Sequence, residues 1–545
     1  RRLRWPLAGS VWRGTVAAGV VAGAGCGSSV TSPDLSLTAL SPQVVCATQS
    51  ARTVKISGDG MTPLTVDSLV AGTHLQLPRI TLSQTQTSSG TPGKRTDIVL
   101  FDGADPAGTS HVNWLNAQGM TFEIYPGMVV SDTTTGAAGG DIDFGLYDVR
   151  VQNPDRREAT LASALAIVQP PSITQVAPSP SCNAQGAVSY TISGRHFLQY
   201  NADLPTVTLV STAGNGLPVS SSAAGVSDCT PLAAPAGITL QDCSTLTVSL
   251  PQGTLLPDDY QVTVTNPGPS RCSSVEDVNL PSSDRTVVIP PPTLTSVGTM
   301  AVCALGDTTL QLTGTNFLLL GNPAVGPTVT INGQVLTTTV DAATCTPVHP
   351  TDAPNAQLCT ALSFTVPTGT VAQGSYSATI TNPGPNACSV TGALQLDVVG
   401  MPTLDAAKAP PNPNPNPTSM CTGGGNLSVT GQNIYSGAAM TVNGFGSTSV
   451  SVTPTGAGVP QTATGNFGGP IPITMGTLAD ITVQNVPGVA ACTATLPRVE
   501  TITPGPSVLF VDPPVIPRVV TMQATIYATG VSAPIKAIRI YPSGS

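Results

Sequence analysis

The residues of this 545-residue chain whose type and spacing most suggest chemistry are its twelve cysteines. None of them forms a Cys-x-x-Cys pair, and no cluster of cysteines and histidines resembles a zinc set. Only 9% of the residues are charged, and many cysteines in such a chain favour an oxidised framework outside the cytoplasm. The alternative is that the cysteines are buried free thiols, which pack as small hydrophobic groups.

Catalytic signatures are missing from the sequence. It holds no Gly-x-Ser-x-Gly elbow, no His-Glu-x-x-His helix and no Gly-x-x-x-x-Gly-Lys phosphate loop. The four histidines, at positions 74, 111, 196 and 349, are scattered at no ligand spacing, and a structural role is the simpler interpretation. We therefore expect a protein that is not an enzyme and that needs no cofactor.

Carboxylates gather only near the N-terminal end, as Asp102 and Asp105 and then Asp141 and Asp143. Calcium prefers several oxygen ligands from flexible loops, so these four residues are weak candidates for a calcium site. Because each pair adjoins glycine, ordinary turn formation explains them better. No metal site is predicted with any other residues.

A short sequence block recurs four times along the chain and shows how the cysteines are spaced relative to predicted strands. Each copy alternates apolar and polar residues and ends in glycine, which is the pattern of a half-buried strand. The copies are Thr53-Val-Lys-Ile-Ser-Gly58, Tyr190-Thr-Ile-Ser-Gly194, Thr309-Leu-Gln-Leu-Thr-Gly314 and Asn426-Leu-Ser-Val-Thr-Gly431. A cysteine lies 12, 12, 11 and 10 residues before the respective glycine. The chain is therefore a repeat protein.

A second block closes each repeat with a strand that runs into an asparagine turn. The copies are Tyr147-Asp-Val-Arg-Val-Gln-Asn153, Tyr260-Gln-Val-Thr-Val-Thr-Asn266, Tyr376-Ser-Ala-Thr-Ile-Thr-Asn382 and Ala479-Asp-Ile-Thr-Val-Gln-Asn485. Further short strands lie between the two blocks, and the 55 glycines and 52 prolines fall mostly between strands. Many short strands separated by turns predict antiparallel β-sandwiches.

Residues 171–400 resemble the IPT/TIG family of immunoglobulin-like domains. The resemblance rests on motifs such as Pro292-Thr-Leu-Thr-Ser-Val, Leu312-Thr-Gly-Thr-Asn-Phe317 and Pro327-Thr-Val-Thr-Ile-Asn-Gly333. It implies an all-β fold of tandem immunoglobulin-like (E-set) β-sandwich domains, which the cysteines would brace with disulfides. We expect a signal at 1–26, a divergent first repeat at 33–168, repeats at 169–289 and 290–400, a divergent fourth repeat at 401–499, and the start of a further β-rich unit at 505–545.

The two outer repeats depart from the family pattern. The first has a long insertion, roughly residues 66–140, in which Trp114 and Tyr125 are the expected exposed aromatics for a ligand. The fourth has Ala479 in place of the closing tyrosine and enters through a proline-rich connector at 410–417. Phe197-Leu198 and Phe317 to Leu320 could form an apolar binding strip, but packing inside the sandwich explains them better.

Placing the cysteines on the repeats predicts their partners. Each early cysteine has a counterpart six or seven residues beyond the closing asparagine, and a second pair in two repeats is separated by 14 positions. The predicted disulfides are Cys182 with Cys272, Cys303 with Cys388, Cys421 with Cys492, Cys229 with Cys243, and Cys345 with Cys359. In the first repeat the counterpart is Ala159, which leaves Cys26 and Cys46 over. Either Cys26 carries a lipid and Cys46 is unpaired, which we favour, or these two pair with each other.

The N-terminus has the pattern of an export signal. Arg1, Arg2, Arg4 and Arg13 are followed by a run of small and apolar residues that is too short to span a membrane as a mature helix. The segment 21–26 resembles a bacterial lipoprotein signal, which implies lipidation at Cys26. Ala24 and Gly25 fit that pattern and Gly23 departs from it. An ordinary signal peptide, with Cys26 among the disulfides, is the alternative.

Charge narrows the class of partner. The formal net charge of −9 argues against binding to nucleic acid, because phosphate recognition needs a basic face. We expect an exported, lipid-anchored cell-surface protein whose repeats act as a binding and spacer scaffold. Its partner would be an extracellular protein or polysaccharide, with the membrane reached through the N-terminal lipid. The alternative is a non-catalytic accessory region of a larger exported enzyme whose catalytic domain lies beyond residue 545.

Overall fold

A computed structural model gives the fold of most of the chain between residues 33 and 529. The residues it describes are 33–46, 49, 52–68, 72–88, 90–93, 97–99, 111–125, 142–214, 216–274, 283–295, 298–321, 324–349, 353–384, 387–405, 419–454, 459–474, 476–504, 507–514, 522–529 and 538. Apart from residues 233–236, the chain divides into two compact units between Val168 and Gln169. Each unit is described by itself.

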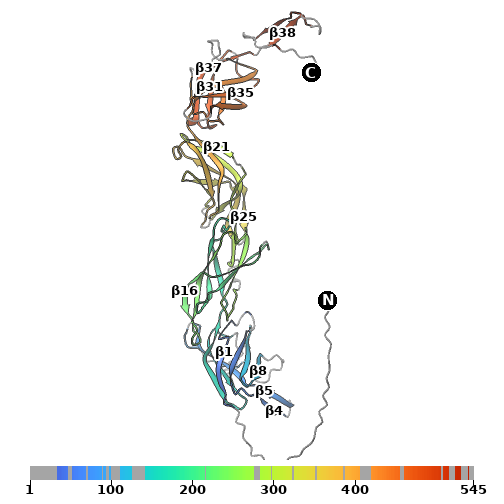
Figure 1. Cartoon of the computed structure of the whole chain (residues 1–545), viewed down its shortest axis with the longest axis vertical. Coiled ribbons are helices and arrows are strands. Elements are labelled where there is room, and N and C mark those ends of the chain that lie inside the picture. The colour runs from blue at the N-terminus through green and yellow to red at the C-terminus, as the bar shows by residue number, and fades with distance from the viewer. Residues whose placement is uncertain are drawn as a thin grey trace, which may run out of the picture. The chain divides into compact units, whose positions relative to one another are not determined.

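Regular structure in the described ranges is almost entirely β, as Figure 1 shows. The helical segments among them are two short 3₁₀ helices, η1 (Ala342–Thr344) and η2 (Ala490–Cys492). No helix in the described part of the chain is long and apolar enough to cross a membrane. The all-β expectation is confirmed, and the strand pairings below give tandem immunoglobulin-like sandwiches.

The first repeat contains two sheets and a separate hairpin. One sheet has the order β1 (Ser36–Ser41), β3 (Arg52–Asp59), β9 (Gly119–Ile124), β8 (Val112–Asn116). The other has the order β2 (Val44–Cys46), β11 (Glu158–Val168), β10 (Gly145–Gln152), β6 (Arg79–Thr87), β7 (Asp97–Val99), and the hairpin is β4 (Leu64–Ser68) with β5 (Gly72–Gln76).

The second and third repeats are built from sheets with a similar strand order. The second has β12 (Ser172–Ala177), β13 (Val188–Tyr200), β17 (Leu240–Leu250), β16 (Gly225–Pro231) in one sheet and β15 (Val219–Ser222), β14 (Thr206–Ser211), β18 (Asp258–Thr265), β19 (Arg285–Val288) in the other. The third has one continuous path of β20 (Thr293–Leu294), β22 (Thr308–Leu320), β26 (Ala353–Val366), β24 (Gln334–Val340), β23 (Thr328–Ile331), β27 (Gly374–Thr381), β28 (Ser389–Val399), β21 (Gly298–Cys303), with β25 (Cys345–His349) beside β26. In this path β24 pairs with both β23 and β26, so it joins the two sheets.

The fourth repeat again has two sheets, and a hairpin follows it. The sheets are β29 (Thr403–Leu404), β31 (Gly424–Gln432), β35 (Gln461–Gly468), β34 (Ser449–Thr453) and β30 (Ser419–Cys421), β37 (Thr493–Thr503), β36 (Leu478–Gln484), β32 (Ala439–Val442), β33 (Phe445–Gly446). The hairpin is β38 (Ser507–Asp512) with β39 (Thr525–Thr529). Each repeat has its own buried apolar cluster.

The interpretation of residues 66–140 as an insertion is wrong in one respect. Strands β6 and β9 lie within this range and pair with β10 and β3 in the two sheets of the first repeat. Ile80, Leu82 and Phe122 from these strands are fully buried. The range therefore supplies core strands that such a sandwich needs, and the alternation of their residues is obscured in the sequence by the residues between them.

The glycine that ends the first recurring block is required by close backbone approach. A Cβ atom at any of these four positions would lie 2.0 to 2.1 Å from a carbonyl oxygen of the neighbouring edge strand. The contacts are Gly58 with Ser36, Gly194 with Ser172, Gly314 with Thr293, and Gly431 with Thr403. No other residue type fits there without moving the edge strand.

The closing asparagine holds the turn that follows this glycine. Two residues after each glycine the chain has a positive φ, at Gly60, His196, Asn316 and Asn433. The buried asparagine amide donates to the carbonyl of that residue, and its side-chain oxygen accepts from the N–H two residues further on. The nitrogen-to-carbonyl distances are 2.7 Å for Asn153, 2.9 Å for Asn266, 2.8 Å for Asn382 and 2.6 Å for Asn485. Both recurring blocks thus meet at one buried hydrogen-bonded turn.

Candidate functional site

Two disulfides lie inside single repeats. Cys229 is joined to Cys243 and Cys345 to Cys359, each with a Cα–Cα distance of 4.0 Å. The members of each pair stand directly opposite each other on adjacent antiparallel strands. A 14-residue separation therefore bridges neighbouring strands and closes the loop between them.

The other predicted pairings are wrong, because two disulfides join consecutive repeats. Cys182 is bonded to Cys388, and Cys303 is bonded to Cys492, with Cα–Cα distances of 5.7 and 5.8 Å. These links replace the predicted partnerships of Cys182 with Cys272, of Cys303 with Cys388 and of Cys421 with Cys492. An early cysteine is thus joined to the cysteine beyond the closing turn of the next repeat.

Strand length explains why the pairing within one repeat fails. In the third repeat Cys303 lies beside Val399, at the end of the parallel strand pair β21 and β28. Cys388 directly precedes the first residue of β28, which has 11 residues. At about 3.3 Å per residue the two ends of β28 are about 35 Å apart. A disulfide requires Cα atoms within about 7 Å, so these two cysteines cannot meet.

The remaining cysteines also differ from expectation. Cys46 is disulfide-bonded, as is Cys272, so the prediction that Cys46 is an unpaired thiol is wrong. Cys46 is fully buried at the end of β2, where a bonded sulfur is easily accommodated. Cys421 is the free cysteine of the described residues. Cys26 lies outside the described residues.

Apolar packing and hydrogen bonds accompany the disulfide between the third and fourth repeats. Cys303 and Cys492 are buried together with Val486, and Val399 and Val489 pack against them. The amide of Asn485 donates across the junction to the carbonyl of Gly400 at 2.9 Å. The link is therefore part of a packed contact between the two repeats.

The junction between the second and third repeats is built in the same way. Cys182 and Cys388 are buried in one cluster with Val287, Ile289, Leu318 and Ala356. The side chain of Gln185 accepts from the backbone N–H of Ser389 at 2.6 Å, and its amide donates to the Ser389 carbonyl. The side chain of Leu318 is 1% exposed, so apolar groups fill this junction.

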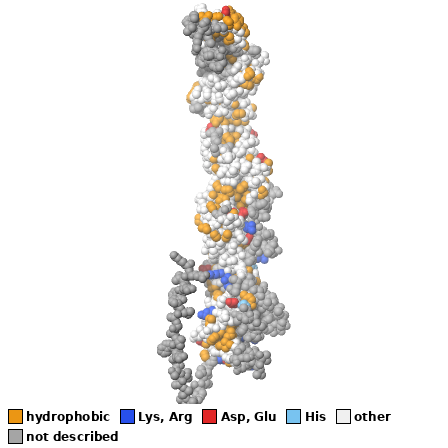
Figure 2. Space-filling view, turned by 90° about the vertical axis from the view of Figure 1, so that its right-hand side faces the viewer, with side chains coloured by type: hydrophobic (Ala, Val, Ile, Leu, Met, Phe, Trp, Pro, Cys, Tyr) orange, Lys and Arg blue, Asp and Glu red, His pale blue; other side chains and the backbone are white. Residues whose placement is uncertain are grey.

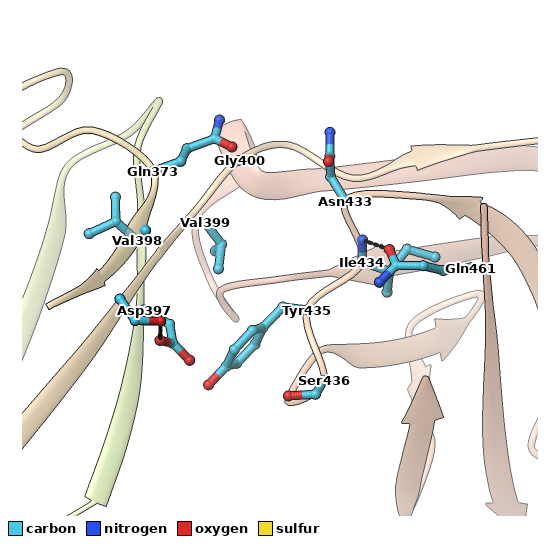
Figure 3. Close-up of a pocket in the computed structure, with 12 residues that line it drawn as sticks. Gln373, Asp397, Val398, Val399, Gly400, Asn433, Ile434, Tyr435, Ser436 and Gln461 are labelled. Atoms are coloured by element: carbon cyan, nitrogen blue, oxygen red, sulfur yellow. Dashed lines mark hydrogen bonds between the residues drawn. The ribbon is translucent and has the colours of Figure 1, made fainter. Parts of the chain in front are cut away.

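A cleft of about 540 Å³ opens at the junction of the third and fourth repeats (Figure 3). The third repeat contributes the end of β28 with Asp397 and the loop residue Gln373, and the fourth contributes the turn from Asn433 to Ser436. Tyr435 extends into the space between Asp397 and Ser436 in the view of Figure 3. Tyr435 occupies the position that Leu318 has in the preceding repeat, since its N–H donates to the closing asparagine at 2.9 Å in the same way.

The electrostatics of the cleft centre on Tyr435 and Asp397. Burial raises the pKa of the Tyr435 phenol, and the neighbouring Asp397 carboxylate raises it further. The hydroxyl of Ser375 donates to Asp397, and Gln461 accepts from the N–H of Ile434 at 2.6 Å. Among the described residues, the lining has one carboxylate, an aromatic ring and three side-chain amides, and it includes no histidine, cysteine, lysine or arginine. This set suits hydrogen bonding to a ligand and lacks a paired nucleophile and base.

Only one of the four candidate calcium residues lies in the part of the chain that the structure describes. Asp102, Asp105 and Asp141 lie outside the described residues, and Asp143 is exposed, with its backbone carbonyl accepting from the Tyr147 hydroxyl at 2.6 Å. Within the described ranges, no three histidine, cysteine or acidic side chains are grouped as a metal site.

The aromatics expected to be exposed in the first repeat are in fact partly buried. Trp114 packs against the core, and its indole N–H donates to the Met61 carbonyl at 2.8 Å. Tyr125 also packs against the core and stacks on His111, with ring centroids 4.0 Å apart. Sequence reasoning missed Tyr435 because its neighbours in the cleft come from two repeats.

Charged groups are sparse on the face of the molecule drawn in Figure 2. Most of the drawn surface there belongs to uncharged side chains, to backbone or to apolar groups. This agrees with a charged fraction of 9%. Thr–Thr and Ser–Thr pairs cross the exposed strands instead, such as Thr309 with Thr365 at 2.8 Å.

Comparisons with known proteins give only distant likenesses. No protein-family profile and no curated protein matches the chain. Similar solved structures include a Ca²⁺-stabilized adhesin that helps an Antarctic bacterium bind ice (15% identity, 87% of this chain and 99% of that chain, TM-score 0.17). Others are the ICAM-5 D1-D4 ectodomain fragment (13%, 86% and 98%, 0.18) and the insect immune protein hemolin (11%, 86% and 100%, 0.17). The fold assignment rests on the strand pairings, and likenesses this low carry no argument about function.

Proposed function

We propose that this protein is an exported, lipid-anchored binding and spacer scaffold of the cell surface. The observation that carries the proposal is the covalent linkage of consecutive repeats through Cys182–Cys388 and Cys303–Cys492. A disulfide restricts the movement of the two repeats that it joins, which is useful in a spacer and of little use in independent modules. Disulfides also persist only where the compartment is oxidising, which supports export.

The proposed anchor is a lipid on Cys26. The proposal rests on the sequence, in which an arginine-rich start and a small-residue run precede this cysteine. Cys46 is in a disulfide, so it is not the unpaired thiol that was expected beside a lipidated Cys26. The anchor would attach the protein to a membrane of the cell envelope.

The proposed recognition surface is the cleft at the junction of the third and fourth repeats. Tyr435 offers a ring face beside the Asp397 carboxylate, and Gln373 and Asn433 also line the cleft and offer hydrogen-bonding groups. None of the described residues that line the cleft is cationic, and their chemistry favours neutral ligands rich in hydroxyl groups over anions. A surface polysaccharide fits this chemistry, and a protein segment with polar side chains is the other candidate.

The anchor is tested on the mature protein isolated from its native envelope. Mass spectrometry of the N-terminal peptide is expected to find Cys26 as the first residue, with fatty acyl groups attached. Substitution of Cys26→Ser is expected to release the protein from the membrane fraction. An unmodified Cys26 inside a disulfide would reject the anchor and leave the scaffold proposal in place.

The recognition surface is tested by glycan-array binding of the full chain, with Tyr435→Ala and Asp397→Asn as the altered proteins. Tyr200→Ala and Asp203→Asn, in the second repeat and away from the cleft, are the matched controls. We expect at least a tenfold loss of binding from each cleft substitution and none from the controls. Equal binding by all four proteins would remove the cleft from the proposal.

A further inference from the structure

A two-stranded β-ribbon of the third repeat packs into the junction with the second repeat. The ribbon consists of β25 and the start of β26, residues 353–359, and the disulfide between Cys345 and Cys359 joins its two strands. Its apolar side chains belong to the cluster that fills this junction. They are Val348, Ala356 and Leu358. The ribbon therefore helps to close the junction.

The ribbon covers the turn residue Leu318 and the strand that continues from it. Leu358 stands opposite Leu318, and Ala356 stands opposite Leu320, on the adjacent antiparallel strands β26 and β22. Val287, from the last strand of the second repeat, lies in the same buried cluster. We call this place, between Leu318 of one repeat and Val287 of the preceding repeat, the ribbon seat.

The cleft between the third and fourth repeats lies at the equivalent place. Tyr435 is the equivalent of Leu318, because both donate a backbone N–H to the closing asparagine. Asp397 is the equivalent of Val287, because each is paired with the residue directly before the closing tyrosine of its repeat. Tyr435 and Asp397 both line the cleft. The cleft is therefore the ribbon seat of this junction.

The fourth repeat has too few residues at this point to build a ribbon of the same length. Leu362 and Ala463 are equivalent, since each pairs with the residue two positions before the recurring glycine. The connection between Val340 and its strand partner Leu362 contains the whole ribbon. The equivalent pair, Val452 and Ala463, is connected by fewer than half as many residues. The shorter connection leaves the seat open as a cleft.

The backbone at this seat also differs from the strand that pairs with the ribbon. β22 continues through Leu318 to Leu320, whereas β31 ends at Gln432. The carbonyl of Tyr435 accepts from the N–H of Ala438 at 3.0 Å, so the chain turns here instead of continuing as a strand. A peptide strand in the cleft would lack the backbone ladder that joins the ribbon to β22. The side chains of the cleft must therefore hold its ligand.

Those side chains are polar, and the fourth repeat leaves room for an aromatic ring among them. Gly437 occupies the position that Leu320 has in the third repeat, and a Cβ atom at Gly437 would lie 2.7 Å from Cε1 of the Tyr435 ring. The ring extends towards Asp397 (Figure 3), and side-chain amides from both repeats complete the lining. A ring face can pack on the apolar face of a sugar, while carboxylate and amide groups hydrogen-bond to its hydroxyls.

We propose that a linear chain of neutral sugar units lies in this seat, in the place of the ribbon, and contacts the third and fourth repeats at once. The seat of the preceding junction holds an extended strand, which is why the ligand is a linear chain. The proposal rests on the binding function proposed above and adds how the ligand lies and what its binding depends on. Because Asp397 and Tyr435 belong to different repeats, the disulfide Cys303–Cys492 holds the two halves of the site together.

The first test measures whether binding depends on this disulfide. The probes are linear neutral oligosaccharides of glucose and of mannose, and calorimetry measures their affinity for the full 545-residue chain. Cys303→Ser with Cys492→Ser should weaken binding about fivefold or more, because the two repeats can then move apart. Cys182→Ser with Cys388→Ser is the matched control, since it removes the link at the other junction, and it should leave the affinity unchanged. Equal affinities of all three proteins overturn the inference.

The second test puts a ribbon back into the open seat. Residues 454–460 are replaced by the sequence of residues 342–359, and the control protein receives a glycine–serine segment of the same length. Without ligand, the ribbon should slow hydrogen exchange in the turn 433–436 relative to the control. Sugar binding should be lost in the ribbon protein and kept in the control. A ribbon protein that forms its new disulfide and still binds the sugar overturns the inference.

The outcomes separate this inference from the function on which it rests. If the unaltered chain binds none of the oligosaccharides, the binding function of the cleft and this inference fail together. If it binds them and neither the disulfide substitutions nor the ribbon weakens binding, the inference alone fails. Binding of a disulfide-closed peptide with the sequence of residues 344–360, without binding of any sugar, would make a protein segment the ligand and would also overturn the inference.

Discussion

Each of the two junctions between repeats in the Gln169–Ser545 unit has one disulfide, but the side chains that fill the two junctions differ. At the junction of the second and third repeats, Leu318 is buried with Val287 and Ile289. At the junction of the third and fourth, the equivalent position is Tyr435, which lines an open cleft beside Asp397. The comparison teaches that the disulfide and the asparagine turn are common to both junctions, while the equivalent turn residue is buried in one junction and lines a cleft in the other.

The largest expected effect comes from removing a link between repeats. Substituting both Cys303→Ser and Cys492→Ser should cost about 3 to 4 kcal/mol in unfolding free energy, because a disulfide closing a long loop constrains the unfolded chain. In this protein, local hydrogen exchange should rise at η2, which carries Cys492. In the protein with Cys182→Ser and Cys388→Ser, exchange near Ser389 should rise less, because apolar packing keeps the junction of the second and third repeats closed. Equal rises at the two junctions would contradict the comparison.

The next largest difference is expected from truncating the equivalent turn residues, Leu318 and Tyr435, because the two substitutions should lower the unfolding free energy by different amounts. Leu318→Ala removes a 1% exposed side chain, and it should cost about 3 kcal/mol because a cavity remains in a packed cluster. Tyr435→Ala should cost less than about 1 kcal/mol, because the partly exposed ring borders a cleft. Denaturant unfolding of both proteins measures the difference, and similar losses would mean that the cleft is as tightly packed as the closed junction.

The closing asparagines should also differ between the repeats. The Asn485 amide donates to both Asn433 and Gly400, at 2.6 and 2.9 Å, whereas the Asn382 amide donates to Asn316 at 2.8 Å. Asn485→Ala should cost about 2 kcal/mol because buried carbonyls lose their donor, and Asn382→Ala should cost somewhat less. Asn485→Asp is the matched variant, since it keeps the acceptor for the Tyr435 N–H. A larger loss for Asn382→Ala would show that the contact to Gly400 adds nothing.

The smallest expected effect is a change in the pKa of the cleft residue Tyr435. Burial and the Asp397 carboxylate raise the pKa of Tyr435 in the folded protein, so its contribution to stability is complete below the ordinary value of about 10 and is lost as pH rises through the folded pKa. Asp397→Asn should lower that pKa by removing the negative charge. Difference absorbance against pH measures the change, with Tyr435→Phe identifying the signal. An unchanged titration in the Asp397→Asn protein would place the carboxylate too far from the ring to matter.

The sequence by itself determined the local chemistry of each repeat. The glycine at the end of the first block and the asparagine of the closing turn recur at fixed places, and their recurrence along the chain is enough to reveal the register of the four repeats. The pairs Cys229–Cys243 and Cys345–Cys359 belong to the same class, because adjacent strands bring residues 14 positions apart face to face.

Only the tertiary structure decided which distant groups meet. Counting residues cannot show that Cys303 and Cys388 lie at opposite ends of β28, or that the cysteine nearest to Cys303 comes from the following repeat. Tyr435 and Asp397 likewise face each other only because two repeats dock. The physical reason is that strand alternation is written along the chain, whereas the separation of the two ends of a strand and the contact between repeats are set by the packing of whole sheets.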